Sequence, residues 1–481
     1  MLRAVCSRRM RDTSVRRKRF LILNWLWARG DQRARKAILT VLAAIAATIP
    51  SARGLSLEEA FVLAASANPT VRAAREAANA DYAAVSVARS AWFPTVYGFA
   101  SADAAYNWLD TTAIQEGDNA GYSTTGRFTL GLVYNHSLYR GGSDTEMLRH
   151  ARRTARQSIA AAQGVQQSVL LRVAVAYLDA LLAGHTVALR EEALAAFEER
   201  AREARVLFEV GERTRSDVAQ AEAEQAVAAT AILSARAQLA IERSLLEKLV
   251  GAPPGRLEPA AEPDPMLLPP TLDDARRAAE HLGPAVRVAQ HALHAAEHAM
   301  RAIHGEAGPT VDLVGSMSVT NKHDQGQRFF LPGAPLTSAD SAARERRADI
   351  SAGIRLRIPI YQAGAVKGRL NQAKRIYLQR REEWMAARLE AVQKAESAWH
   401  NLQTARERSA AILTAVMASA TALEHIRHEA DVGERSLREV LDAQRVLVEQ
   451  EIEALTAERD RIVESYRLLE AVGGLRIGEL R

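Results

Sequence analysis

Histidine side chains supply the most regular spacing of potential metal ligands in this chain. His291, His294 and His298 recur at i, i+3 and i+7, so on a helix they share one face, and imidazole nitrogens bind Zn²⁺ and related ions. Neither a cysteine nor a pair of carboxylates accompanies them, and a solvated helix face produces the same spacing. We therefore predict a surface face here, with metal binding as the alternative, and no cofactor for the chain.

Two carboxylates, Glu439 and Asp442, lie three residues apart and would also share a helix face. Ser436 precedes Glu439 by three residues, which is the spacing of a capping box, where both side chains bond backbone groups at a helix start. A capping role accounts for a carboxylate at position 439 without any catalytic or binding function. The sequence contains no GxSxG, HExxH or phosphate-loop motif, and we predict that the chain is not an enzyme.

An internal repeat organises the chain that carries these residues. A segment beginning at Val210 (VGERTRSDV) returns at Val432 (VGERSLREV), an offset of 222 residues. Upstream, LEEA at Leu57 corresponds to LDDA at Leu272, an offset of 215. Such a period is too long for a solenoid and indicates two copies of one structural half. We place the first copy at 55–250, a proline-rich linker at 251–271, the second copy at 272–475 and a short tail at 476–481.

The basic charge of the chain is confined to its N-terminus. Residues 1–36 carry twelve Lys and Arg against two Asp, a balance of +10, whereas the whole chain is +6. The remainder is therefore about −4, which argues against nucleic acid as a partner. An apolar run at 37–49 followed by small residues predicts a secretory signal peptide over 1–54, with a membrane anchor as the alternative. The only cysteine, Cys6, precedes that run, so the mature chain would lack cysteine.

Alternating apolar residues predict one β-hairpin in each half, at 95–139 and 310–361. We expect four strands of about 10–13 residues, near the 9–11 that a tilted strand needs to cross a bilayer. Long polar loops at about 108–126 and 321–348 join the strands of each hairpin. Four aromatic residues fit either a girdle at the membrane surface or ordinary strand positions, namely Tyr106, Trp108, Tyr134 and Tyr139.

A very long helix without internal proline follows each hairpin, at 143–209 and 364–431. A helix of roughly 67 residues is about 100 Å long. Gly211 and Gly433 follow these helices as C′ residues, and shorter helices are expected at 215–250 and 437–470. Apolar residues at alternating spacings of three and four predict a coiled-coil core along the first long helix: Leu170, Val173, Tyr177, Ala180, Gly184 and Val187.

A sheet of four strands cannot close on itself in a membrane, because the smallest membrane barrels have about eight strands. Several chains must therefore contribute strands to one barrel, and the helices that follow would form a second, helical tube. We expect a mixed α/β membrane protein with duplicated halves that acts as a conduit. The alternative from another class is a coiled-coil scaffold outside the membrane.

The repeated segments resemble those of the TolC family of outer-membrane efflux and type I secretion ducts, over about residues 55–475. The resemblance is carried by the segments at Val210 and Val432 and by two strand–helix joints, SLYRGG at Ser137 and PIYQAG at Pro359. It implies a homotrimer in which four transmembrane strands per chain are pooled into a 12-stranded outer-membrane barrel, continued by a periplasmic α-helical coiled-coil barrel. It also implies docking to a periplasmic adaptor (membrane fusion) protein and to an inner-membrane ABC or proton-driven transporter.

The resemblance also implies roles for individual residues. Glu439 and Asp442 would form acidic rings at a periplasmic aperture, where crowded carboxylates raise one another's pKa and attract cations, with simple capping as the alternative for Glu439. Arg435 and Asp217 would latch neighbouring hairpins, or else be two solvated charges. Tip residues would dock the adaptor (Val210, Gly211, Val432 and Gly433), and five residues would form the joints (Tyr139, Gly141, Gly142, Tyr361 and Gly364). Ser137 and Ala363 depart from the family's proline and glycine.

The function implied by the resemblance is passive exit across the periplasm and the outer membrane for substrates delivered by an inner-membrane transporter. We expect type I protein secretion, with small-molecule, drug or metal efflux as the alternative. The lumen of a duct specifies little, so the cargo would be chosen by the inner-membrane partner.

Overall fold

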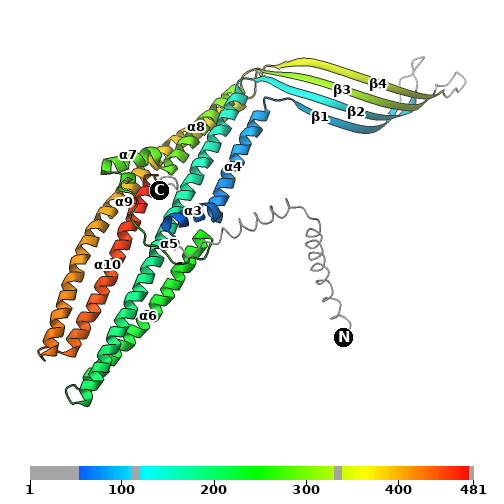
Figure 1. Cartoon of the computed structure of the whole chain (residues 1–481). Helices are drawn as coiled ribbons and strands as arrows, with labels where there is room; N and C mark the ends of the chain where they lie inside the picture. Colours follow the sequence, from blue (N-terminus) through cyan, green and yellow to red (C-terminus); the bar gives the residue numbers. More distant parts are fainter. Residues whose placement is uncertain (1–53, 110–119, 330–338, 476–481) are drawn as a thin grey trace, which may run out of the picture. The chain divides into compact units, whose positions relative to one another are not determined.

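The computed structural model describes residues 54–109, 120–329 and 339–475 (Figure 1). The predicted signal peptide, apart from Gly54, and the predicted C-terminal tail lie outside these residues. The helices are α3 (Leu57–Ala67), α4 (Pro69–Ser90), α5 (Ser143–Glu209), α6 (Arg215–Val250), α7 (Leu272–Leu282), α8 (Pro284–Gly305), α9 (Ala365–Asp431) and α10 (Leu437–Ala471). The strands are β1 (Thr95–Leu109), β2 (Ala120–Arg140), β3 (Thr310–Phe329) and β4 (Ala339–Arg357).

The four strands form one antiparallel sheet in the order β1-β2-β3-β4. They contain 15, 21, 20 and 19 residues, so the prediction of 10–13 was too short. Backbone pairing continues through polar stretches that were assigned to loops, as at Thr124 and Gln325, because ladder hydrogen bonds do not require apolar side chains. At its other end β4 stops at Arg357, before the expected limit at 361.

The two faces of the sheet differ in polarity. Residues directly opposite one another point to the same face, so the register aligns Leu132, Met317 and Ile350 in one row. These three side chains are all exposed in the single chain. On the opposite face, Thr129 and Thr320 hydroxyls lie 3.2 Å apart, and Ser316 and Ser351 hydroxyls lie 2.8 Å apart. One face is therefore suited to lipid and the other to water.

The helices lie side by side and continue from the strands (Figure 1). The first long helix, α5, packs against α4, α6, α8 and α10, whereas α9 packs against α7, α8 and α10. The predicted coiled-coil core of α5 is confirmed at Leu170, Val173 and Tyr177, which are fully buried. Near the far end of α5, Phe197 packs in a cluster that includes Leu441 of α10, so this cluster joins the two helical hairpins.

The proline-rich linker is attached to the helices through backbone carbonyl groups. The Tyr177 hydroxyl donates to the carbonyl oxygen of Glu258 in the linker, at 2.7 Å. The buried Gln167 side chain donates to the carbonyl of Gly473, just after α10, at 2.9 Å. Asn68 donates to the carbonyl of Leu249 near the end of α6, at 3.0 Å. The start of the linker region is thereby fixed to the N-cap of α4, and both Glu258 of the linker and the residues after α10 are fixed to α5.

Candidate functional site: hairpin tips and strand–helix joints

The tips of the two helical hairpins have the same backbone geometry. Gly211 and Gly433 have φ of 86° and 84°, a left-handed conformation that glycine adopts without strain. Beyond them, the N–H of Glu212 donates to the Leu207 carbonyl at 2.9 Å, and that of Glu434 to the Glu429 carbonyl at 2.8 Å. This is a Schellman motif, which ends the long helix and reverses the chain. It leaves Val210 and Val432 exposed at the tips.

Glu439 is the acid of a capping box at the start of α10. The Ser436 backbone N–H donates to Glu439 Oε2 at 2.9 Å, and the Arg435 guanidinium donates to Oε1 at 2.9 Å. The hydrogen bonds from Ser436, followed by those from Arg435, hold the pKa of Glu439 below its ordinary value. Within one chain this is opposite to the rise expected for crowded carboxylates.

Asp442 is less compensated than Glu439. Its carboxylate lies 3.8 Å from Arg438 on one side and 3.8 Å from Arg445 on the other, both beyond hydrogen-bond distance. The side chain is about half exposed. Of the two predicted aperture acids, Asp442 is therefore the less tightly bonded, and it lies between two guanidinium groups.

The structure does not bring the predicted latch residues together within one chain. Arg435 pairs with Glu429 at 2.9 Å and with Glu439 at 2.9 Å, both on its own hairpin. Asp217 accepts a hydrogen bond from the Thr214 backbone N–H at 2.9 Å. Hydrogen bonds from Thr214 lower the pKa of Asp217. Within the described residues no ion pair joins Arg435 to Asp217. A latch between different chains remains a prediction.

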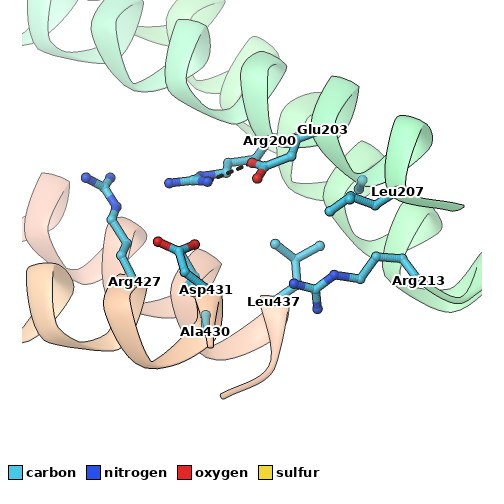
Figure 2. A pocket seen from close by; sticks show the side chains of 10 residues that line it. Arg200, Glu203, Leu207, Arg213, Arg427, Ala430, Asp431 and Leu437 are labelled. Atoms are coloured by element: carbon cyan, nitrogen blue, oxygen red, sulfur yellow. Dashed lines mark hydrogen bonds and ion pairs between the residues drawn. The ribbon is translucent and has the colours of Figure 1, made fainter. Parts of the chain in front are cut away.

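A charged cluster that the sequence did not predict lies between the two tips. Figure 2 shows Arg200, Glu203 and Arg213 facing Arg427 and Asp431 around a cavity of about 20 Å³. Arg200 and Glu203 form an ion pair at 2.7 Å. Among the residues that the structure describes, Arg427 has only the neutral Gln444 amide oxygen as a hydrogen-bond partner, at 3.0 Å. Burial, and then the charge of Arg200, lowers the pKa of Arg427.

A comparison of the two copies of the internal repeat indicates this cluster from the sequence. At the offset of 222, Arg427 and Gln444 correspond to Arg205 and Glu222, which form an ion pair at 2.8 Å. The second copy therefore keeps the arginine and replaces its carboxylate partner by a neutral amide. Comparing the charges of the two copies position by position would have marked Arg427 as an unpaired charge.

The first strand–helix joint is held by close backbone contact. Gly141 and Gly142 have φ of 60° and 82°. A Cβ on Gly141 would overlap with the carbonyl of Gly305 at the end of α8, whereas a Cβ on Gly142 would meet nothing within 4 Å. Tyr139 of the same joint lies in β2 opposite Val311, just after an irregularity between Ser137 and Tyr139.

The second joint has the same left-handed turn but lacks a close backbone contact like that between Gly141 and Gly305. Gly364 has φ of 77°, and Ala363 before it has φ of 49°, a left-handed conformation that a side chain disfavours. Ile360 and Tyr361 are 96% and 87% exposed and lie outside β4. Apolar residues that are exposed in this way indicate a surface that either lipid or another chain covers.

The histidine face is not solvated, so that prediction was wrong. His291, His294 and His298 are half-buried because α8 packs against both α5 and α9. His298 Nδ1 lies 2.8 Å from Glu146 of α5. Burial, followed by the charge of Arg153, lowers the pKa of His291 and of His294. Across residues 54–109, 120–329 and 339–475, no group of three or more His, Cys, Asp or Glu is placed to hold a metal ion.

The two long helices are unequally covered. By length and composition alone, both α5 and α9 contain a stretch apolar enough to cross a membrane, and 50% of that stretch is buried in α5 against 6% in α9. Repeat-related residues show the same contrast, since Gln167 of α5 is 5% exposed and Leu389 of α9 is 73% exposed. In α6, Ile241 is exposed, whereas its counterpart Val463 of α10 is fully buried. Within the part of the chain that the structure describes, the outer faces of α9 and α6 therefore lack neighbours.

Comparison with known proteins identifies the architecture. A family model described as outer membrane efflux protein matches residues 61–252 and 276–474. The outer membrane efflux protein BepC of Brucella suis is 30% identical over 446 residues, covering 92% of this chain and 91% of BepC. The outer membrane protein TolC of Vibrio cholerae is 26% identical over 407 residues, covering 84% and 87%.

Solved structures show the same fold. The CmeC outer membrane channel of Campylobacter jejuni matches with a TM-score of 0.70 at 17% identity, over 87% of this chain and 85% of CmeC. The channel protein CusC matches with a TM-score of 0.69 at 20% identity, over 89% and 96%. The four strands thus belong to the pooled barrel of trimeric TolC-like channels and the long helices to the periplasmic tunnel. The chain belongs to the outer membrane efflux protein family, whose members are channels of tripartite export systems and not enzymes.

Proposed function

We propose that the chain forms a homotrimeric export duct with an acidic, latched periplasmic aperture, and that its cargo is protein secreted by a type I system. The observation that carries the duct is the unequal covering of repeat-related helices. The outer faces of α9 and of α4 and α6 lack the neighbours that α5, α8 and α10 have within the chain. A second copy placed on these faces would give every long helix the surroundings of α5.

The aperture is supported by the tips. Asp442 and Glu439 lie on the first two turns of α10, beside the chain reversal at Gly433. Because Arg435 already neutralises Glu439, the Asp442 ring would dominate attraction of cations in a trimer. For the latch, Arg435 would exchange one of its two carboxylate partners for Asp217 of a neighbouring chain.

Single-channel recording in planar bilayers tests the aperture. With Arg435→Ser we expect a rise in conductance, because the latch is removed while the capping box of Ser436 and Glu439 is kept. With Asp442→Asn we expect reduced preference for cations. Arg202→Ser serves as the control, since Arg202 is exposed and pairs with Glu199 of its own helix. Unchanged conductance in Arg435→Ser would overturn the latch.

The cargo class rests on the joint motifs and on sequence similarity to TolC across most of its length. Small-molecule efflux is the second candidate, favoured by the description of BepC as an efflux protein. Deleting the gene and restoring it separates the two. Loss of an exported protein from the medium, without a change in drug or metal tolerance, supports type I secretion, whereas the reverse result supports efflux. A gene for an ABC exporter beside this one would support type I secretion, whereas a gene for a proton-driven pump would support efflux.

A further inference from the structure

Among the described residues, the sheet of one chain has two unpaired edges, the outer edges of β1 and of β4. Unpaired backbone groups at an edge are costly within a membrane, where no water is present to bond them. The proposed homotrimer pairs them by bringing β4 of one chain beside β1 of the next. Which residues then lie opposite one another follows from the internal repeat.

The two hairpins of the chain superimpose in register. An offset of 215 carries Thr95 onto Thr310, and an offset of 222 carries Asn135 onto Arg357. The structure pairs Thr95 with Asn135 and Thr310 with Arg357. Hence β3 is the counterpart of β1, and β4 is the counterpart of β2. The observed pairing of β2 with β3 is therefore a template for the pairing of β4 with the β1 of another chain.

We propose that β4 pairs with β1 of the partner subunit in the register that this template gives, a conclusion that rests on the proposed homotrimer. The observed pair of Leu130 and Val319 becomes Ala352 opposite the partner's Ala104. The observed pair of Leu132 and Met317 becomes Ile354 opposite the partner's Ala102. Further along, Leu356 lies opposite the partner's Ala100 and Ile358 opposite the partner's Gly98.

Side-chain size and polarity agree with this register. Ile354, Leu356 and Ile358 are bulky and exposed in the single chain, and the β1 residues that they meet are glycine or alanine. A displacement by one residue would turn these side chains to the polar face of β1. On that polar face, the register places Arg355 diagonally across from Asp103 of the partner, within reach of a long side chain.

Pro359 gives independent support. Its counterpart in β2 is Ser137, the last residue before the irregularity in the pairing of β2 with β3. Proline lacks a backbone N–H and is tolerated in sheets at edges and at bulges. Pro359 thus falls directly beside the irregularity of the template, where proline is tolerated.

The same register explains the exposed second joint. In the first joint Tyr139 lies in a strand opposite Val311, and its counterpart Tyr361 would lie opposite the partner's Val96. Ile360 and Tyr361 have no strand partner among the described residues of the single chain, because in this register the residues that pair with them belong to another subunit. We therefore expect 358–361 to join the sheet when the trimer forms.

Cysteine cross-linking tests the register, because Cys6 in the predicted signal peptide is the only native cysteine. Ala104→Cys with Ala352→Cys places thiols directly opposite each other, with Cα atoms about 4.5–5.5 Å apart. Controls combine Ala104→Cys with Ile350→Cys or with Ile354→Cys, which displaces the pair by two residues to about 7–8 Å, beyond the reach of a disulfide. Within one chain β1 and β4 lie about 14 Å apart, so every cross-link joins two chains. A further pair, Val96→Cys with Tyr361→Cys, tests whether Tyr361 of the second joint lies opposite the partner's Val96.

After mild oxidation of the full-length protein in outer membranes, we expect at least tenfold more covalent oligomer on non-reducing gels from the matched pair than from either displaced pair. Native gels of the same samples report whether the trimer has formed. An intact trimer that is cross-linked better by a displaced pair, or by none of the pairs, would overturn the register and leave the duct standing. A monomer in every sample, wild type included, would overturn the proposed assembly itself.

Discussion

Replacing Gly141 by alanine should destabilise the protein far more than the same change at the adjacent Gly142. Both residues have left-handed φ angles, and a side chain in that region costs about 1–2 kcal/mol. The loss of unfolded-state freedom offsets roughly 0.4–1 kcal/mol of this cost. Gly142→Ala should therefore cost about 0.5–1 kcal/mol, because its new Cβ meets open space.

For Gly141→Ala the overlap with the Gly305 carbonyl adds to that strain, because backbone must move and not a flexible side chain. Overpacking of this kind costs about 1–3 kcal/mol, which gives a total of about 2–4 kcal/mol. Because the joint connects β2 to α5 beside the end of α8, we expect less protein in the outer membrane as well.

Thermal denaturation of the detergent-extracted oligomer, followed by the loss of the heat-modifiable band, ranks the two variants. Gly305→Ala gives an internal check, since its Cβ would lie 2.7 Å from the Gly141 carbonyl oxygen. The double variant should be less destabilised than the two single effects together, because both disturb one contact. Equal losses at Gly141 and Gly142 would refute the reasoning.

Three other changes test the remaining geometry. Ala363→Gly should raise the denaturation midpoint by relieving left-handed strain worth about 1 kcal/mol, and an unchanged or lower midpoint would contradict this. Phe197→Ala should cost about 3–5 kcal/mol, because Phe197 is buried between the hairpins, and denaturant titration measures the loss. His291 and His294 have pKa values below the ordinary 6.5, so the folded protein binds fewer protons than the unfolded chain just below that pH. The stability that the two neutral side chains contribute should therefore be fully present above pH 6.5 and should be lost as the pH falls below it. Replacing both by glutamine should flatten the pH dependence of the midpoint between pH 7 and 5.

The helices were predictable because their signals are local. The glycines at 211 and 433 and the capping boxes at Thr214 and Ser436 set the helix ends through contacts within a few residues. The strand ends were not, because a strand stops where its partner stops and the partner is remote in sequence. β4 ends at Arg357 because its partner β3 begins at Thr310, directly opposite.

The histidine face was misread for a related reason. A periodic polar stripe shows which residues share a side of a helix, but it does not show how many helices surround that side. In α8 the small residues Ala295 and Ala302 are buried and let neighbouring helices approach closely. The neighbouring helices α5 and α9 then partly cover the histidines. Arg427 was missed because its isolation depends on Gln444, a residue that is distinctive only beside its counterpart Glu222.

The repeat also shows where the tunnel wall is strong. Within a chain the two hairpins meet through Phe197, Leu437, Leu441 and Val448. The corresponding residues, which under the proposed trimer face each other between chains, are Ser419, Arg215, Ala219 and Ala226. Each replacement removes apolar bulk, and burial of a large apolar side chain is worth about 1.5–3 kcal/mol. Under the proposed trimer, the apolar free energy at these four positions would therefore be concentrated within each chain. The contacts between chains would be left to polar groups such as Arg435 and Asp217, which would exchange partners at low cost when the proposed aperture opens.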